Sequence, residues 1–169
     1  MTLQYSAVGI QNESHMATSI DDYWKDLERL KISIGYAVWN CSLDLPVRLV
    51  TVSEGGIGGW CLGGGDEHIR IAREVVPEIP GKETEFLGAL CKEHNIYLIA
   101  QMVAKAPDLM KDRIFNIAFI IDPNGEVIHQ HIKTSFYQRE TNTAPSDIWN
   151  LYLEKYGDER RTEIIPFSG

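Results

Sequence analysis

The chain has 169 residues, of which 44% are apolar and 24% are charged. These proportions are ordinary for a globular protein, and a single domain near this size removes roughly 70% of its unfolded surface from water. The formal net charge of −8 disfavours nucleic-acid binding, because phosphate backbones are bound by clusters of Lys and Arg and only 16 such residues are spread along this chain.

No basic segment followed by an apolar stretch marks an N-terminal targeting signal, and no apolar run reaches the roughly 18 residues that a membrane span needs. We therefore expect a soluble, cytoplasmic protein with no membrane partner. The three cysteines, Cys41, Cys61 and Cys91, are widely spaced and form no CxxC pair. This pattern predicts neither a disulfide framework nor a zinc site, and it favours a reducing compartment.

The first predicted elements alternate between strand and helix. Thr2–Ile10 is predicted to be a strand, and Ser19, with Asp22 three residues later, is typical of a helix N-cap with a capping box. Val47–Val52 is a short, β-branched apolar run of the kind found in buried strands. The helix between the two strands carries one apolar stripe, formed by Ile20, Trp24, Leu27, Leu30 and Ile34.

A glycine-rich segment, Gly55–Gly65, follows the second strand and holds seven of the chain's 14 glycines. It matches no phosphate-binding motif, because GxGxxG would need a glycine where Cys61 stands and no GK[ST] follows. We interpret the segment as backbone that turns tightly or approaches another group closely, since glycine tolerates positive φ.

The next elements are a helix, Glu83–His94, with Asn95 as its candidate C-cap, and a strand, Tyr97–Val103. Two further strands, Arg113–Ile121 and Glu126–Ile132, are joined by the turn Asp-Pro-Asn-Gly, the strongest hairpin signal in the chain.

A last helix is predicted from Ser146 to Tyr156, followed by a strand over Glu163–Phe167. The order of elements predicts an α/β fold in which helices pack on a mixed sheet.

Glu54 and Lys133 are the candidate catalytic residues. Glu54 follows the buried strand Val47–Val52 at the edge where open α/β sheets bind ligands, so it can act as a general base, although its position alone favours a solvated loop glutamate. Lys133 ends the last strand of the hairpin, where a lysine is ordinarily a solvated edge charge. If both act on one reacting centre, their charged groups lie within about 8 Å of each other.

Two other patterns can carry chemistry. His129 and His131 form an HxH on one strand face, but Lys133 continues that face and no further ligand completes a set, so we predict no metal there. Cys91 lies on the apolar side of its helix, where a buried and inert thiol is usual. Cys61, in the glycine segment, is the less ordinary candidate for a nucleophile.

Four segments, in this order, resemble the nitrilase or carbon–nitrogen hydrolase superfamily. AVGIQN (Ala7–Asn12) is similar to its first strand, and LVTVSEGGIGGW (Leu49–Trp60) to the strand that delivers the catalytic glutamate, with Ser53 where a proline is usual. EFLGALCKEHNIYLIA (Glu85–Ala100) resembles the helix and strand that follow.

The fourth segment, RIFNIAFIIDPNGEVIHQHIK (Arg113–Lys133), is the most specific match. It resembles the strand, D-x-x-G turn and strand that deliver the catalytic lysine. Ile117 replaces the usual Thr or Ser, and His131-Ile132 replaces Tyr-Arg, while the turn and the spacing to the lysine are kept. The resemblance covers nearly the whole chain and is weakest over Pro145–Gly157.

The resemblance implies a role for several residues. Glu54 matches the general base and Lys133 the group that stabilises the tetrahedral intermediate. Glu140 lies near the place of a second, supporting glutamate, one residue short of the family spacing, and Trp60 matches an aromatic beside the pocket. Asn116 matches a structural residue of its strand.

The family nucleophile is a cysteine that follows the lysine in a G-x-x-I-C pattern, and no cysteine follows Lys133 here. The order Glu–Lys–Cys also counts against Cys61. The resemblance therefore implies that residues 1–169 are the N-terminal part of a single carbon–nitrogen hydrolase domain, a portion of an α-β-β-α sandwich that ends before the catalytic cysteine. Such a chain is expected to be inactive alone and to expose an apolar face beside its last strand.

The implied activity is hydrolysis of a non-peptide C–N bond in a small amide, without a metal or organic cofactor, by a full-length protein that is a homo-oligomer. A nitrilase or nitrile-hydrating enzyme is the alternative within the family. A non-catalytic α/β binding module that lost the nucleophile is the alternative from another class.

Overall fold

The computed structural model describes residues 4–59, 65–134 and 142–157 of the chain. Five strands form one sheet in the order β1-β2-β3-β4-β5. They are β1 (Ser6–Ile10), β2 (Val47–Val52), β3 (Tyr97–Lys105), β4 (Ile114–Ile121) and β5 (Val127–Ile132).

The sheet is mixed. β1, β2 and β3 are parallel, while β4 is antiparallel to β3 and β5 is antiparallel to β4. β5 therefore runs in the same direction as β2, and the C-terminal ends of these two strands lie at the same edge of the sheet. The N-terminal end of β4 lies at that edge as well. The expected α/β fold with a mixed sheet is confirmed.

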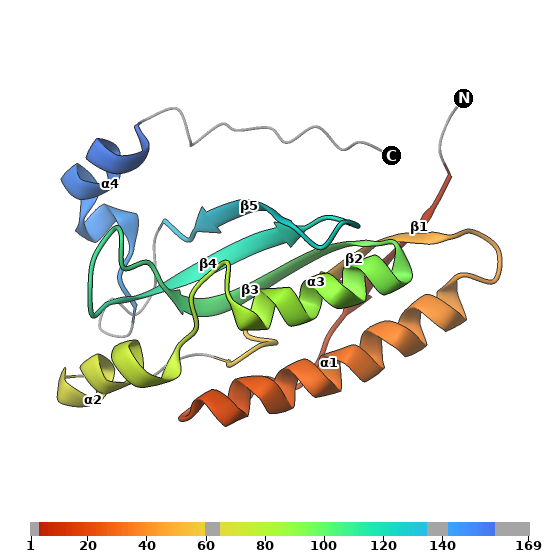
Figure 1. Cartoon of the computed structure of the whole chain (residues 1–169), viewed down its shortest axis with the longest axis horizontal. Coiled ribbons are helices and arrows are strands. Elements are labelled where there is room, and N and C mark those ends of the chain that lie inside the picture. Colours follow the sequence, from red (N-terminus) through yellow and green to blue (C-terminus); the bar gives the residue numbers. More distant parts are fainter. Residues whose placement is uncertain (1–3, 60–64, 135–141, 158–169) are drawn as a thin grey trace.

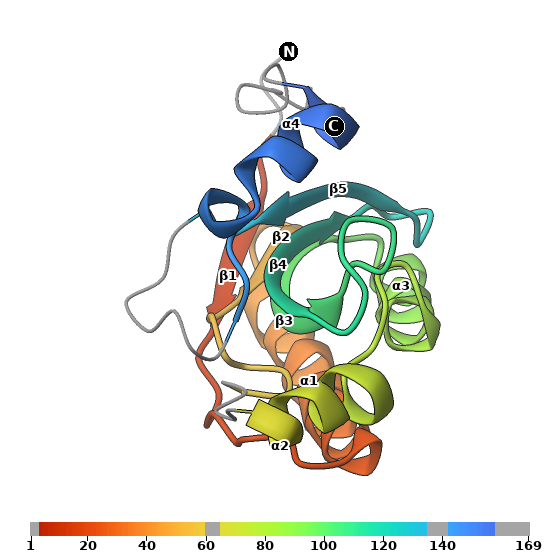
Figure 2. The ribbon, with the colours of Figure 1, turned by 90° about the vertical axis from the view of Figure 1, so that its left-hand side faces the viewer.

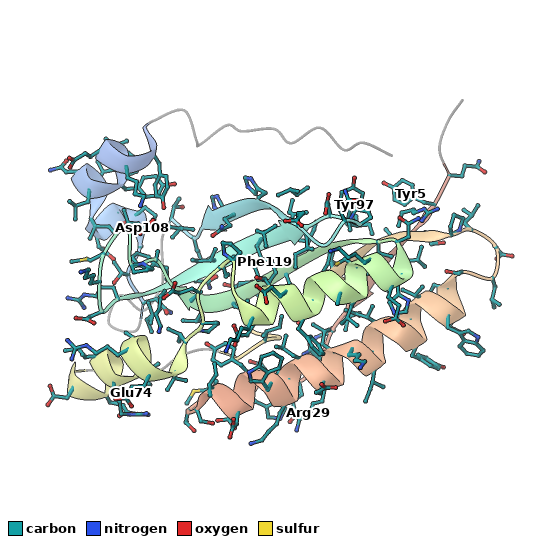
Figure 3. All side chains as sticks on the ribbon, in the orientation of Figure 1. Tyr5, Arg29, Glu74, Tyr97, Asp108 and Phe119 are labelled. Atoms are coloured by element: carbon teal, nitrogen blue, oxygen red, sulfur yellow. The ribbon has the colours of Figure 1, made fainter. Side chains whose placement is uncertain are left out.

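The helices α1 (Ile20–Cys41) and α3 (Lys82–His94) cover one face of the sheet, and α4 (Trp149–Tyr156) lies on the other side (Figures 1 and 2). The main core fills the space between the sheet and α1 and α3. Its largest fully buried side chains include Leu27, Leu87 and Phe119, the last labelled in Figure 3. No helix in the described segments is long and apolar enough to cross a membrane.

The predicted helix boundaries are confirmed where capping residues set them. α1 begins after Ser19, whose backbone N–H donates to Asp22 Oδ2 at 3.1 Å. α3 ends at Asn95, which adopts the left-handed conformation with φ 53°. No end of this helix was predicted from the sequence, and α1 extends to Cys41, beyond Ile34 at the end of the predicted apolar stripe.

Three other boundaries differ from the sequence prediction. The first strand begins at Ser6, and Thr2 lies outside the described residues, as does the predicted strand Glu163–Phe167. The last helical segment is divided into a short turn, Pro145–Asp147, and α4, because Ile148 has a φ of −129° that a continuous helix cannot accommodate. Two further elements, α2 (Gly65–Arg70) and the π-helical turn Ile71–Val75, were not predicted from the sequence.

Candidate active site

The candidate active site lies at the edge of the sheet where β2 and β5 end. Glu54 comes two residues after β2 and Lys133 one residue after β5. Lys133 Nζ contacts Glu54 Oε1 at 2.6 Å, although the two residues are 79 positions apart in the chain. The expectation that their charged groups lie within about 8 Å is confirmed.

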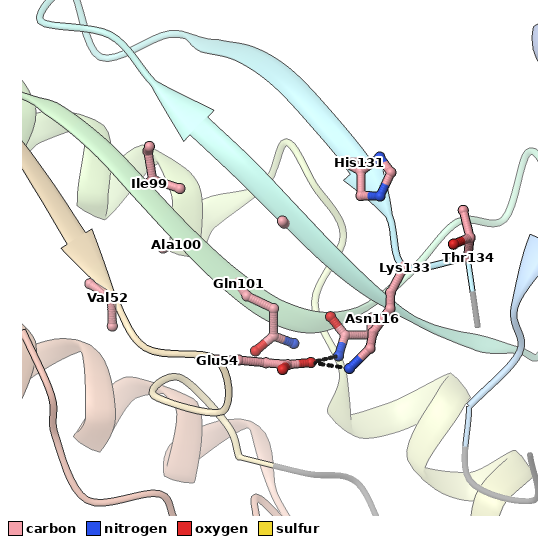
Figure 4. Close-up of a pocket in the computed structure, with 10 residues that line it drawn as sticks. Val52, Glu54, Ile99, Ala100, Gln101, Asn116, His131, Lys133 and Thr134 are labelled. Atoms are coloured by element: carbon pink, nitrogen blue, oxygen red, sulfur yellow. Dashed lines mark hydrogen bonds and ion pairs between the residues drawn. The ribbon is translucent and has the colours of Figure 1, made fainter. Parts of the chain in front are cut away.

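Asn116 links the two charged residues. Its Nδ2 group donates to Glu54 Oε1 at 2.8 Å, so that one carboxylate oxygen accepts from both an ammonium and a carboxamide (Figure 4). The backbone carbonyl of Asn116 also accepts from the N–H of Lys133 at 2.9 Å. Asn116 is 2% exposed, so packing in β4 fixes the group that orients Glu54.

Gln101 of β3 fixes the backbone beside Glu54. Its Oε1 accepts from the N–H of Gly55 at 2.7 Å, which identifies the orientation of the carboxamide, since a nitrogen in that place could not accept. The Nε2 group of Gln101 is buried without a hydrogen-bond partner among the residues that the structure describes. Both Gln101 and Asn116 thus hold the site in place from the middle of the sheet.

The glycine segment after Glu54 turns tightly against α1, as its composition predicts. Gly55 and Gly58 have φ angles of 78° and 70°, which side chains on L-residues disfavour. The N–H of Gly58 donates to Asp26 Oδ2 at 3.0 Å, and a Cβ at Gly58 would collide with the Tyr23 ring. The loop that carries Glu54 is therefore anchored to the helix layer.

A cavity of about 490 Å³ opens beside these groups. Its polar wall consists of Glu54, Gln101, Asn116 and Lys133, and the rest of its lining is Val52, Ile99, Ala100, Ala118, His131 and Thr134. The side chains of Glu54 and Lys133 are 42% and 40% exposed, so Glu54 is less enclosed than its apolar strand neighbours suggest. A small substrate can reach both charged groups from this cavity.

Some of the remaining candidate residues lie outside the described segments, and others lie on β5 beside the cavity. Trp60, Cys61 and Glu140 lie outside the described residues. His131 lines the cavity and His129 is half-buried on the same strand, and the described residues contain no group of three side chains that could hold a metal ion. That His129 and His131 bind no metal remains a prediction.

The described cysteines lie away from this chemistry. Burial raises the pKa of the Cys91 thiol to about 12, and the Asp122 carboxylate adds to the shift, so Cys91 is protonated at neutral pH. Cys41 ends α1 and precedes β2, which places it toward the opposite edge of the sheet from Glu54.

From the sequence, Asn116 was expected to be a structural residue of its strand, and no role was predicted for Gln101. Residue type was the signal available in the sequence, because Gln101 and Asn116 are polar residues inside the otherwise apolar strands β3 and β4. A polar side chain buried in a sheet needs a partner, and here the partners are Gly55 and Glu54.

Comparison with known proteins shows which family the chain belongs to. The family model of carbon–nitrogen hydrolases matches residues 8–165. The chain belongs to the carbon–nitrogen hydrolase family.

Among curated relatives, the chain is similar to a formamidase of Helicobacter acinonychis, with 35% identity over 63 residues that make up 37% of this chain and 19% of that protein. A formamidase of Bacillus cereus is 37% identical over 60 residues, 36% of this chain and 18% of the relative.

Solved structures share the fold. A carbon–nitrogen hydrolase of Helicobacter pylori superposes with a TM-score of 0.58 at 16% identity, covering 80% of this chain and 44% of that one. A cysteine-to-serine variant of an N-terminal amidase gives 0.62 at 17% identity, covering 81% and 30%. This chain therefore spans less than half the length of these carbon–nitrogen hydrolase family structures.

Proposed function

We propose that this protein takes part in hydrolysis of the C–N bond of a small amide, with Glu54 as general base and Lys133 as the cation that stabilises the tetrahedral intermediate. The observation that carries the proposal is the contact of Lys133 Nζ with Glu54 Oε1 at the mouth of a cavity. A base and a fixed cation that both reach one small space can act on the same carbonyl group. The formamidase relatives make formamide the first substrate to test.

In the proposed reaction a cysteine thiol gives its proton to Glu54 while its sulfur bonds to the amide carbon. The carbonyl oxygen becomes negative and is stabilised by the Lys133 ammonium. Glu54 then gives the proton to the nitrogen, the C–N bond breaks, and ammonia or an amine leaves a thioester. Water attacks the thioester and gives a proton to Glu54, which returns it to the departing sulfur. No metal or organic cofactor takes part.

The nucleophile in this proposal is a cysteine that follows Lys133 in the complete protein. Cys91 does not fit, because it is fully buried in the core and does not line the cavity, and Cys41 lies toward the opposite edge of the sheet. We further propose, from the family pattern, roles for two residues outside the described segments: Trp60 in substrate binding and Glu140 as a supporting glutamate.

The test is release of ammonia from formamide by the 169-residue chain and by the chain extended through the coding sequence that follows it. We expect turnover only by the extended protein, and a loss of at least about 100-fold in its Glu54→Gln and Lys133→Met variants. Hydrolysis by the chain alone, abolished by Cys61→Ala, would instead identify Cys61 as the nucleophile.

Two further outcomes separate the alternatives. Conversion of a nitrile to its acid, with no activity on amides, would make the protein a nitrilase. A folded extended protein that binds amides but hydrolyses neither substrate would indicate a binding module.

A further inference from the structure

Asp26 is a buried carboxylate on the side of α1 that faces the core, and its side chain is 4% exposed. The other buried positions of α1 are Tyr23, Leu27, Leu30 and Ile34. A charge that is removed from water is costly unless hydrogen bonds or an opposite charge compensate it. Well-packed apolar side chains often serve stability as well as a buried ion pair does, so packing alone does not account for a carboxylate at this position.

The two carboxylate oxygens of Asp26 have different partners. Oδ2 accepts from the backbone N–H of Gly58 at 3.0 Å. Oδ1 accepts from the Arg29 guanidinium at 3.4 Å, and His15 Nδ1 lies 3.6 Å from the same oxygen. Arg29 is 59% exposed, so a cation at the surface compensates the buried charge. The second oxygen is therefore left to hold the glycine segment that follows Glu54.

The segment that Asp26 holds begins directly after Glu54 and restricts its own backbone little. Four of the five residues 55–59 are glycines, and the neighbours Gly58 and Gly59 have φ angles of 70° and 59°. Glycine loses more conformational freedom on folding than any other residue. Contacts from outside the segment must therefore fix the path of this backbone, and with it the direction of the Glu54 side chain.

Neutral groups hold the same segment from other sides. Asn12 Nδ2 donates to the carbonyl oxygen of Gly56 at 2.6 Å, and the N–H of Ala17 donates to the carbonyl oxygen of Gly58 at 3.1 Å. The contact from Asp26 differs because its acceptor is ionised. Hydrogen bonds to ionised groups are roughly twice as strong as those between neutral groups. At Gly58 the carboxylate therefore contributes more to fixing the segment than a neutral acceptor of the same shape would.

We propose that Asp26 is a positioning residue for the reaction proposed above, and that its charge holds Glu54 against Lys133 through the N–H of Gly58. The inference rests on that proposed function. Asp26 does not line the cavity and acts from the helix layer behind the segment. Asparagine at this position keeps the shape and loses the charge. If its oxygen accepts from Gly58, its NH2 group faces the Arg29 guanidinium, which is also a donor. Asp26→Asn should therefore loosen the segment without opening a cavity.

A zero-length crosslink measures the contact that Asp26 is proposed to maintain. A water-soluble carbodiimide joins a carboxylate to an amine that touches it, and the carbodiimide takes up the lost water as a urea. In the extended protein it should form an amide between Glu54 and Lys133, which lie 2.6 Å apart (Figure 4). We expect the yield of this amide to fall at least about fivefold in Asp26→Asn. The internal reference is the crosslink between Lys155 and Asp108, 3.2 Å apart, whose yield should not change.

The matched control is Asp44→Asn, at an exposed aspartate before β2, which should give the wild-type yield of both crosslinks. A folded Asp26→Asn protein with the wild-type yield of the Glu54–Lys133 crosslink overturns the proposal, as does a wild type that forms none. Loss of both crosslinks means that the variant has not folded, and residue-resolved hydrogen exchange of the wild type then decides. The amide of Gly58 should exchange at least about 100-fold more slowly than in an unstructured peptide, and exchange at the peptide rate overturns the proposal.

Steady-state kinetics of the extended protein tests the catalytic consequence separately. We expect kcat for formamide to fall about 10-fold in Asp26→Asn with a smaller change in KM, because the base is displaced while the cavity is unchanged. An unchanged kcat, with or without a higher KM, would overturn the positioning role. A wild type that hydrolyses no amide would refute the proposed function, whereas the crosslink would still report whether Asp26 holds Glu54 against Lys133.

Discussion

Asn116 Nδ2 donates a 2.8 Å hydrogen bond to Glu54 Oε1 across 62 residues of the chain. Replacing Asn116 by leucine removes this donor and leaves Lys133 as the remaining contact of Glu54 Oε1 described above. A hydrogen bond to a charged group contributes about 1.5–3 kcal/mol, so we expect kcat for formamide to fall roughly 10–100-fold with a smaller change in KM. The measurement is steady-state kinetics on the extended protein, with Asn150→Leu, an exposed asparagine on α4, as the control. Unchanged kcat would show that Asn116 does not position Glu54.

Lys133→Met should separate a catalytic role from a structural one. The side chains of Lys133 and Glu54 are 40% and 42% exposed, so loss of their ion pair should change the free energy of unfolding by only about 0–1 kcal/mol. Loss of the cation from the proposed reaction should lower kcat by about 100–1,000-fold. Urea denaturation and formamide turnover on the same preparations make the comparison. A destabilised protein that retains activity would assign Lys133 to the fold alone.

Two glycines in helices should respond to alanine in opposite directions. In Gly88→Ala the new Cβ meets the Gly125 carbonyl at 2.5 Å, and we expect a loss of about 1–3 kcal/mol in the free energy of unfolding. In Gly35→Ala the new Cβ meets nothing within 4 Å, and the helix should gain about 0.5–1 kcal/mol. The measurement is urea denaturation of both variants and the wild type. Equal effects of the two variants would contradict the packing of α3 on the hairpin.

Asp122 should make stability depend on pH in the acid range. Burial raises the pKa of Asp122, but hydrogen bonds from the backbone and side chain of Asn124 and from the backbone of Glu126 and Gly125 outweigh it, so the pKa in the folded protein is lowered. These hydrogen bonds to the Asp122 carboxylate therefore add to the free energy of unfolding. Their contribution is fully present above the ordinary aspartate pKa of 3.8 and is lost as the pH falls through the lower pKa of Asp122 in the folded protein.

The check is the free energy of unfolding of wild type and Asp122→Ala between pH 7 and pH 2. We expect the variant to be about 1–2 kcal/mol less stable at pH 7 and the two curves to converge in acid. Asp44→Ala, an exposed aspartate in another turn, is the control and should follow the wild type. Parallel curves for wild type and Asp122→Ala would contradict the role given to this turn.

Cys91 should resist thiol reagents in the folded protein. Because burial raises its pKa to about 12, the thiolate that reacts with iodoacetamide is absent at pH 8, whereas the exposed Cys41 should be modified. Mass spectrometry of peptides after partial alkylation reports each site. Equal modification of both cysteines in native protein would show that α3 opens readily.

The sequence predicts the elements that local chemistry determines. Asn95 ends α3 because asparagine tolerates the left-handed conformation, and Asp122 to Gly125 form the expected turn. The C-terminal end of α1 was not predicted, because the apolar stripe ends at Ile34 while the helix continues to Cys41. The last two turns carry exposed Tyr36 and Trp39, so an amphipathic pattern does not define where the helix stops.

Only part of the candidate site was predictable from the sequence, because strand register cannot be predicted from one strand alone. The order and direction of the strands bring Glu54 and Lys133 together. The position of each residue directly after a strand could be predicted from the sequence. The hydrogen bonds of Gln101 and Asn116 depend on register, in which Gln101 lies opposite Ala118 and Asn116 opposite Val103. Register is set by the packing of the whole sheet, and periodicity along one strand does not report it.

The sequential order of the strands, β1 to β5, has a consequence for synthesis. Each new strand joins the edge formed by the strand before it, so the sheet can grow in the direction in which the ribosome delivers the chain. Glu54 emerges with β2, whereas its two partners arrive 62 and 79 residues later. The nascent protein therefore carries an unpaired carboxylate at a growing sheet edge until the β4–β5 hairpin docks. The contacts of Glu54 with Asn116 and Lys133 are therefore the last part of this edge to form.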